Sequence, residues 1–320
     1  MGASGEPSTD GGTLFLAGME ELWVVDVEAE TVERIERPEL GAGDPPHLIA
    51  RVGDRLAMWA YDVRAIPLDD PSTDAEMLAR DGWIFIPAAD PNRIWVGYLD
   101  RSTGGARGLR ELREIDANGN AVTRGVVPPD GAWPYAEVAG GLLFQTPKPT
   151  LWDPETGRTL RVYGLEELGD MGDVSGDVLA SCPGECGNLL FTDLATGKQR
   201  SVPAPAGLKY AVWTGEFSPD GETYAVPVLA REGGWRAFSE NAQRLALVSV
   251  ADGTVSIVDG STVAPGYVFT AWSASGDHVF LTGGGPETAR EVVSYQLGTE
   301  TVDHLDLDLD VGAFYDVAVG

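Results

Sequence analysis

The chain has few of the residues that build metal, redox and nucleic-acid sites. Its 320 residues include 2 cysteines and 3 histidines. The 22 lysines and arginines are outnumbered by 50 acidic residues, which gives a formal net charge of −28. Binding to nucleic acid or to anionic lipid requires clustered cations, because the release of counterions supplies much of the affinity. We therefore expect no nucleic acid and no anionic membrane surface among its partners.

Long apolar runs are also missing. No run approaches the roughly 18 residues that a membrane-spanning helix needs, so we expect no direct membrane insertion. Residues 1–12 consist mainly of glycine, serine, threonine, proline and acid, without the charged and apolar regions of an export signal. We interpret them as a disordered leader left after a signal or lipid anchor is removed. The predicted domain then covers residues 13–320 and works outside the cytoplasm, secreted or lipid-anchored.

No catalytic motif is recognisable. The three histidines, His47, His278 and His304, lie in separate segments, which excludes His-Glu-x-x-His and clustered metal sites. Ser175 has Asp173 where a nucleophile elbow needs glycine. We therefore predict no catalytic residue, no metal and no cofactor.

The two cysteines are Cys182 and Cys186, in the sequence Cys-Pro-Gly-Glu-Cys. Pro-Gly is a strong turn signal, so the segment should fold back and bring the two Cβ atoms near disulfide distance. We favour a disulfide. Free thiols and a two-ligand metal site are the alternatives, and zinc would need further ligands.

What the chain has in plenty is turn residues and short β-rich runs. It contains 41 glycines, 21 prolines and 9 tryptophans, a composition typical of many short strands joined by tight turns. The β-rich runs are separated by hairpin turns that contain Asp, Gly or Thr. These turns are Asp26–Thr31, Asp116–Gly119, Asp153–Gly157, Asp193–Gly197, Ala251–Gly253 and Leu297–Glu300.

A second type of turn completes the repeat. Phe217-Ser-Pro-Asp-Gly221 precedes a strand, and Trp272-Ser-Ala-Ser-Gly276 is a degenerate copy. Together with Asp193-Leu-Ala-Thr-Gly197, this pattern resembles the TolB-like and WD-type propeller repeats, over residues 13–320. The resemblance implies a β-propeller and says little about function. The Gly-His and Trp-Asp signatures of true WD repeats are missing, apart from a single match at Trp152-Asp153.

Counting the runs predicts seven blades. Blade two should use His47–Val52, Leu56–Tyr61, Val63–Leu68 and Ala75–Ala79, and blade three Trp83–Ala88, Arg93–Leu99, Leu109–Ile115 and Ala121–Val127. Later blades should begin at Tyr135 and near Met171, Ala211 and Val268. The spacing of about 44 residues suits four-stranded blades.

The two ends of the chain complement each other. The first unit has three runs, Thr13–Ala17, Leu22–Val27 and Thr31–Glu36, while a surplus run, Ala313–Val319, follows blade seven. If the last run joins the first sheet, the ring closes without an open edge. We therefore predict an all-β, seven-bladed β-propeller. A pair of β-sandwiches and a six-bladed ring are the alternatives.

In a propeller, the loops between second and third strands and those between blades emerge on one face. The long insertions, 100–108, 231–243 and 283–290, fall there and hold arginines, and aromatic residues of these and neighbouring segments join them. Arginine and aromatic residues are the types enriched in interface hot spots. The predicted binding residues are Arg101, Arg107, Trp133, Tyr135, Tyr210, Trp213, Arg231, Trp235, Arg236, Phe238, Tyr267 and Arg290.

Two main functions remain at this point, and a third possibility is a sensor domain cut from a larger membrane protein. The first is a non-enzymatic binding or scaffolding module, expected to be a monomer, that recognises a protein partner or an extracellular polymer on this face. The second is a propeller hydrolase or lyase with a scattered, metal-assisted site at the channel mouth, since such sites leave no local motif. Its candidate residues are His47, Glu137, Asp173, Glu216 and Asp316.

Overall fold

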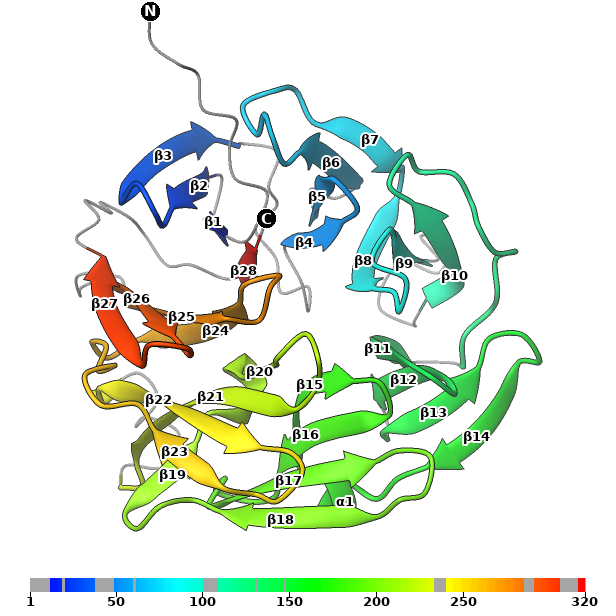
Figure 1. Ribbon diagram of the computed structural model, residues 1–320. Helices are drawn as coiled ribbons and strands as arrows, with labels where there is room; N and C mark the ends of the chain where they lie inside the picture. Colours follow the sequence, from blue (N-terminus) through cyan, green and yellow to red (C-terminus); the bar gives the residue numbers. More distant parts are fainter. Residues whose placement is uncertain are drawn as a thin grey trace, which may run out of the picture.

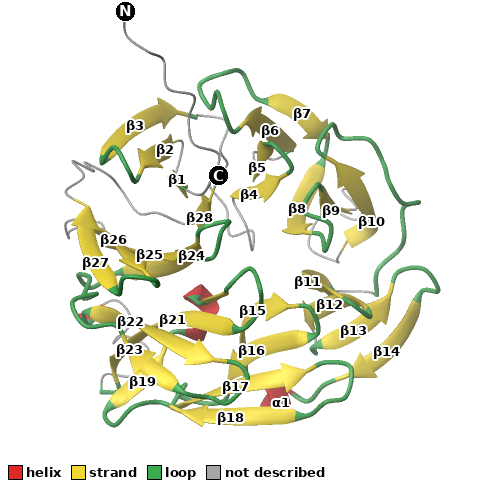
Figure 2. Ribbon diagram, in the orientation of Figure 1, coloured by secondary structure: helices red, strands yellow, loops and turns green. Residues whose placement is uncertain are grey.

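Seven small antiparallel sheets stand side by side in a ring (Figure 1). The computed structural model describes residues 12–18, 21–37, 49–59, 62–99, 109–129, 132–146, 148–232, 240–284, 291–305 and 316–319. Strands and turns dominate this part of the chain (Figure 2). Its helices are the short α1 (Leu165–Leu168) and the 3-10 helix η2 (Val212–Thr214). The chain is therefore an all-β, seven-bladed β-propeller, as predicted.

The first four blades hold the following strands, given from the inner strand to the rim. Blade 1 contains β28 (Asp316–Val319), β1 (Thr13–Ala17), β2 (Glu21–Asp26) and β3 (Thr31–Glu36). Blade 2 contains β4 (Ile49–Val52), β5 (Arg55–Trp59), β6 (Val63–Pro67) and β7 (Glu76–Ala79). Blade 3 contains β8 (Gly82–Pro87), β9 (Arg93–Leu99) and β10 (Leu109–Asp116). Blade 4 contains β11 (Trp133–Val138), β12 (Gly141–Thr146), β13 (Thr150–Asp153) and β14 (Arg158–Val162).

The last three blades follow the same order. Blade 5 contains β15 (Asp170–Ser175), β16 (Val178–Cys182), β17 (Asn188–Asp193) and β18 (Gln199–Pro203). Blade 6 contains β19 (Leu208–Tyr210) and β20 (Glu216–Phe217), both paired with β21 (Thr223–Ala230), and then β22 (Gln243–Ser249) and β23 (Val255–Ile257). Blade 7 contains β24 (Tyr267–Trp272), β25 (His278–Gly284), β26 (Glu291–Gln296) and β27 (Thr301–Leu305).

The predicted ring closure is confirmed. The C-terminal strand β28 pairs antiparallel with β1, with Leu14 opposite Val319 and Leu16 opposite Val317. The red C-terminal strand therefore lies beside the blue N-terminal strand at the centre of the ring (Figure 1). Both ends of the propeller belong to one sheet, and the edge of β1 is covered.

Blade 3 corrects the strand prediction. The run 121–127 was expected to form its fourth strand, but the sheet has three strands, and this segment makes only two isolated bridges, Leu112 to Val126 and Ile115 to Ala121. Gly125 lies so close to the Glu111 side chain that no Cβ would fit there, and Val122 and Val127 are exposed, so the segment gains little from packing as a strand. The inner strands of blades 4 to 7 also begin one to three residues earlier than predicted, at Trp133, Asp170, Leu208 and Tyr267.

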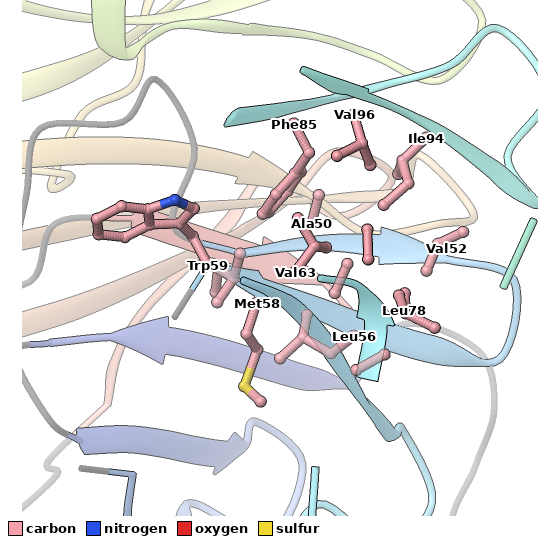
Figure 3. Close-up of a cluster of buried hydrophobic side chains, with 14 of the residues drawn as sticks. Ala50, Val52, Leu56, Met58, Trp59, Val63, Leu78, Phe85, Ile94 and Val96 are labelled. Carbon is pink, nitrogen blue, oxygen red and sulfur yellow. The ribbon is translucent and has the colours of Figure 1, made fainter. Parts of the chain in front are cut away.

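Buried apolar clusters join every pair of neighbouring blades, because alternate side chains of each strand point toward the blade on either side. The largest joins blades 1, 2 and 3. In Figure 3, Leu56, Met58 and Val63 of blade 2 gather with Phe85 and Val96 of blade 3. The core is thus a ring of interfaces between blades.

The turns are held by local side-chain bonds. In the turn after Phe217, the Ser218 hydroxyl donates to Asp220 and accepts from the amide of Thr223. Gly221 has a φ of 72°, a conformation that costs glycine little. Within the described residues, no helix has both the length and the hydropathy that crossing a membrane requires.

Candidate functional site on the loop face

The order of the strands defines one face of the ring, here called the loop face. In an antiparallel blade read from the centre to the rim, the start of the first strand, the end of the second and the start of the third lie at the same end. Trp133 and Tyr267 start inner strands, Cys182 ends a second strand, and Arg231 follows directly after β21. Chain topology therefore places these residues on the loop face.

The aromatic residues of blade 4 are packed into the inner wall. Trp133 and Tyr135 are both partly buried. The Tyr135 hydroxyl donates to the carbonyl of Gly172 in blade 5. Burial raises the pKa of Tyr135, and the nearby Asp173 carboxylate raises it further. The neutral phenol is therefore a fixed bridge between the two blades.

Blade 6 carries three of the predicted residues. Tyr210 is fully buried, its hydroxyl donates to the carbonyl of Pro203 at 3.2 Å, and burial raises its pKa to about 12. Trp213 lies on η2, which interrupts the inner strand between β19 and β20, and it is 36% exposed. Arg231 is exposed, and its guanidinium lies over Gly187 in blade 5. Arg231 is therefore exposed on the loop face, Trp213 is partly exposed midway along the inner strand, and Tyr210 is part of the core.

The prediction also named Tyr267 and six residues of the long loops. The structure gives Tyr267 only as the first residue of β24. The others lie outside the described residues: Arg101, Arg107, Trp235, Arg236, Phe238 and Arg290.

The disulfide loop occupies the same face of blade 5. Cys182 and Cys186 are bonded, with their Cα atoms 4.9 Å apart, and both are buried. Across the first hairpin, Asp170 pairs in register with Cys182, and burial raises the pKa of its carboxyl. Sequence reasoning missed Asp170, because only the strand register brings it beside cysteines 12 and 16 positions later. Its place as the first residue of an inner strand was the available signal.

The carboxylates predicted as catalytic candidates form hydrogen bonds between adjacent blades. Glu137 accepts from the amide of Ala89 at 2.8 Å and from the indole of Trp95 at 2.9 Å, both in blade 3. Asp173 of blade 5 accepts from the amide of Phe217 in blade 6 at 2.8 Å.

Glu216 repeats the arrangement one blade further on. It accepts from the amide of Trp272 in blade 7 at 3.1 Å, and the Trp272 indole donates to the Glu216 carbonyl at 3.0 Å. Each of these three carboxylates therefore satisfies a backbone donor of an adjacent blade. His47 lies outside the described residues, and Asp316 is placed only as the first residue of β28.

Comparisons with known proteins support the fold. No protein-family model matches the chain, and no curated protein matches it. Three solved structures are similar over most of its length: the dihydro-heme d1 dehydrogenase NirN in complex with DHE, a puromycin-hydrolyzing peptidase of Mycobacterium tuberculosis, and AztD of Citrobacter koseri.

These similarities are structural only. The identities are 12%, 16% and 11%, with TM-scores of 0.50, 0.54 and 0.50. The matches cover 95%, 95% and 98% of this chain, and 75%, 55% and 87% of the other chains. The chain thus spans about half of the peptidase. At such identities the similarity shows the propeller fold alone, and neighbours that include enzymes do not decide between binding and catalysis.

Proposed function

We propose that this propeller is a non-enzymatic binding module that holds a protein partner or a polymer against its loop face. The proposal rests on the hydrogen bonds of three inner-wall carboxylates, Glu137, Asp173 and Glu216. Each carboxylate accepts a backbone amide of a neighbouring blade. A general acid or base needs a carboxyl group that can reach a substrate proton, whereas these groups are engaged in joining blades.

The loop face and the inner wall next to it offer side chains that binding needs. Arg231 lies on the loop face beside the disulfide loop, and Trp213 lies on η2, midway along the inner strand of blade 6. Tryptophan and arginine are the residue types that most often dominate binding energy at interfaces.

We further propose that the protein works outside the cytoplasm and that its repeats are of the TolB-like type. A disulfide persists in oxidising compartments, and this chain has one between Cys182 and Cys186. The turn at Phe217–Gly221, with Ser218 bonded to Asp220, supports the repeat type.

Site-specific photo-crosslinking in the cells of origin tests the binding function. A photoreactive phenylalanine at position 231 should give a discrete adduct with the partner. The same residue at position 158 is the matched control, since Arg158 is also an exposed arginine but starts β14 on the opposite face. Adducts at position 158 as strong as those at 231, or none at either position, would count against a specific loop-face partner.

Affinity gives the second arm of the test. The double variant Trp213→Ala, Arg231→Ala should weaken binding of the crosslinked partner by about 2 kcal/mol or more, the size of a hot spot. The control variant Arg158→Ala, Leu160→Ala removes an arginine and an exposed apolar side chain from the rim of blade 4. It should bind like the wild type.

A further inference from the structure

Three potential metal ligands meet at the loop face of blade 5. One carboxylate oxygen of Asp170 and the sulfur atoms of Cys182 and Cys186 all lie within 4.8 Å of one another. Four-coordinate zinc with bonds of about 2.0–2.3 Å requires ligand atoms about 3.3–3.8 Å apart. Once the bond between the two sulfur atoms is broken, they must separate to about 3.8 Å. The carboxylate oxygen already lies within 4.8 Å of both, so side-chain rotations can complete such a set.

The backbone around the cysteines is fixed independently of the sulfur atoms. Cys182 ends β16 and is held in register with Asp170. The carbonyl of Cys186 accepts from the amide of Tyr210 at 3.0 Å, and the carbonyl of Gly187 accepts from the amide of Ala204 at 2.9 Å. The two sulfur atoms would therefore stay close together after the bond between them is broken.

In the part of the chain that the structure describes, the carboxylate of Asp170 is not engaged by another side chain, and burial alone raises its pKa. Among the described residues, no hydrogen-bond donor and no cationic side chain is bonded to it, and it is partly buried. Thiolate sulfur favours thiophilic metals, and a set of two sulfurs and one oxygen suits Zn²⁺.

We propose that reduction of the Cys182–Cys186 disulfide opens a Zn²⁺ site made of the two thiolates and the Asp170 carboxylate. Water occupies the fourth position, as in zinc sites with three protein ligands. The disulfide form does not bind the metal, because its sulfur atoms carry no charge. The site is a redox-gated one, and it stands independently of the proposed partner binding.

The chemistry balances with an external dithiol as reductant. The dithiol transfers two electrons to the disulfide and becomes a disulfide itself, and the chain gains two thiols. Binding of Zn²⁺ then releases both thiol protons, since the thiolate is the ligand.

Titration with Co²⁺, a spectroscopic stand-in for Zn²⁺, tests the proposal on the full chain. Protein reduced by a phosphine under anaerobic conditions should bind one Co²⁺ and show thiolate-to-cobalt charge-transfer absorption, which Zn²⁺ abolishes. The oxidised protein should show none. Absence of this absorption from the reduced protein would overturn the proposal.

Asp170→Asn tests the third ligand with little change in shape. It should weaken Zn²⁺ binding by about tenfold or more, since loss of even an outer partner of a metal ligand costs about 10–100-fold. Asp177→Asn, on the other end of the same hairpin, is the matched control and should bind like the wild type. Circular dichroism verifies that both variants fold. Equal Zn²⁺ affinity of Asp170→Asn and the wild type would remove Asp170 from the site and overturn the proposal.

Discussion

At the scale of single residues, Gly172 shows how closely blades 5 and 6 approach at the inner wall. A Cβ at this position would meet the carbonyl of Val212 and lie 2.5 Å from the Tyr224 hydroxyl. The same hydroxyl lies 2.5 Å from a Cβ built on Gly215 and donates to the Val212 carbonyl at 2.6 Å. Burial and the Asp173 charge raise the pKa of Tyr224, so this hydrogen bond is kept at all ordinary pH values.

Gly172→Ala should therefore destabilise the protein. We expect a loss of about 1–3 kcal/mol in the free energy of unfolding, the usual cost of overpacking a core, measured by urea denaturation. Gly298→Ala is the control, because nothing lies within 4 Å of a Cβ there. It should change stability by no more than about 0.5 kcal/mol. Equal denaturation midpoints for the two variants would show that the wall adjusts freely.

The sequence indicated part of this close approach at the inner wall. Glycine precedes an acid at Gly172-Asp173 and again at Gly215-Glu216; the first pair lies in β15, and the second lies where η2 meets β20. The acids could be selected as inner-wall polar residues, but their role could not be predicted. The donors that they bind, Phe217 and Trp272, come from the next blade, and no local pattern specifies which backbone amide will face a given carboxylate.

At the scale of elements, β28 closes the ring. It covers the edge of β1 through four residue pairs, from Leu14 with Val319 to Ala17 with Asp316. An uncovered strand edge leaves unpaired backbone groups and invites association with other chains.

A chain that ends before Asp316 should be less stable and prone to self-association. We expect a loss of about 2–4 kcal/mol, if each ladder bond contributes about 0.5–1 kcal/mol net, seen as a lower thermal unfolding midpoint and as oligomers in size-exclusion chromatography. A chain that ends at Val319 keeps the strand and serves as the control. An unchanged midpoint in the shorter chain would show that closure adds little to stability.

Most elements could be predicted because hairpin turns and β-rich runs leave local signals. Asp153–Gly157 and Asp193–Gly197 join the strands that the pattern indicated. Two elements depart from it for reasons of packing. Segment 121–127 makes two isolated bridges instead of a full strand, and its Gly125 lies so close to the Glu111 side chain that no Cβ would fit. The inner strand of blade 6 is interrupted by η2, where Gly215 lies against the ring of Tyr224. That contact joins the end of η2 to β21, so periodicity cannot reveal it.

At the scale of the whole molecule, the dominant property is the net charge of −28. Like charges on a compact body repel one another and destabilise the folded state. Salt screens this repulsion, since the Debye length falls from about 30 Å at 0.01 M to about 8 Å at 0.15 M.

The thermal unfolding midpoint should therefore rise with sodium chloride by several degrees over this range. Differential scanning fluorimetry measures the midpoint, and potassium chloride should give the same curve, because screening depends on ionic strength and not on the identity of the cation. A midpoint that falls with salt would mean that attractive ion pairs, such as Arg55 with Glu76, outweigh the general repulsion.

The number of blades could be derived from the repeat period and from the complementary ends, because both are properties of the whole sequence. A ligand for the proposed binding face could not be derived, since long loops on a rigid ring are the most variable part of such a fold. The cluster of Asp170 with the two cysteines could be predicted only in part. Each residue is visible in the sequence, but only the register of β15 with β16 brings them together.

The pairing of β1 with β28 also determines how the molecule responds to tension between its two ends. Leu14, near the start of β1, lies opposite Val319, near the end of β28, so both attachment points are at the same end of an antiparallel pair. A pulling force would break the hydrogen bonds between β1 and β28 one after another, starting at this end, and would separate the two strands at low force. If the two chain ends were attached to other bodies, stretching would separate β28 from β1 before any other strand pair opened.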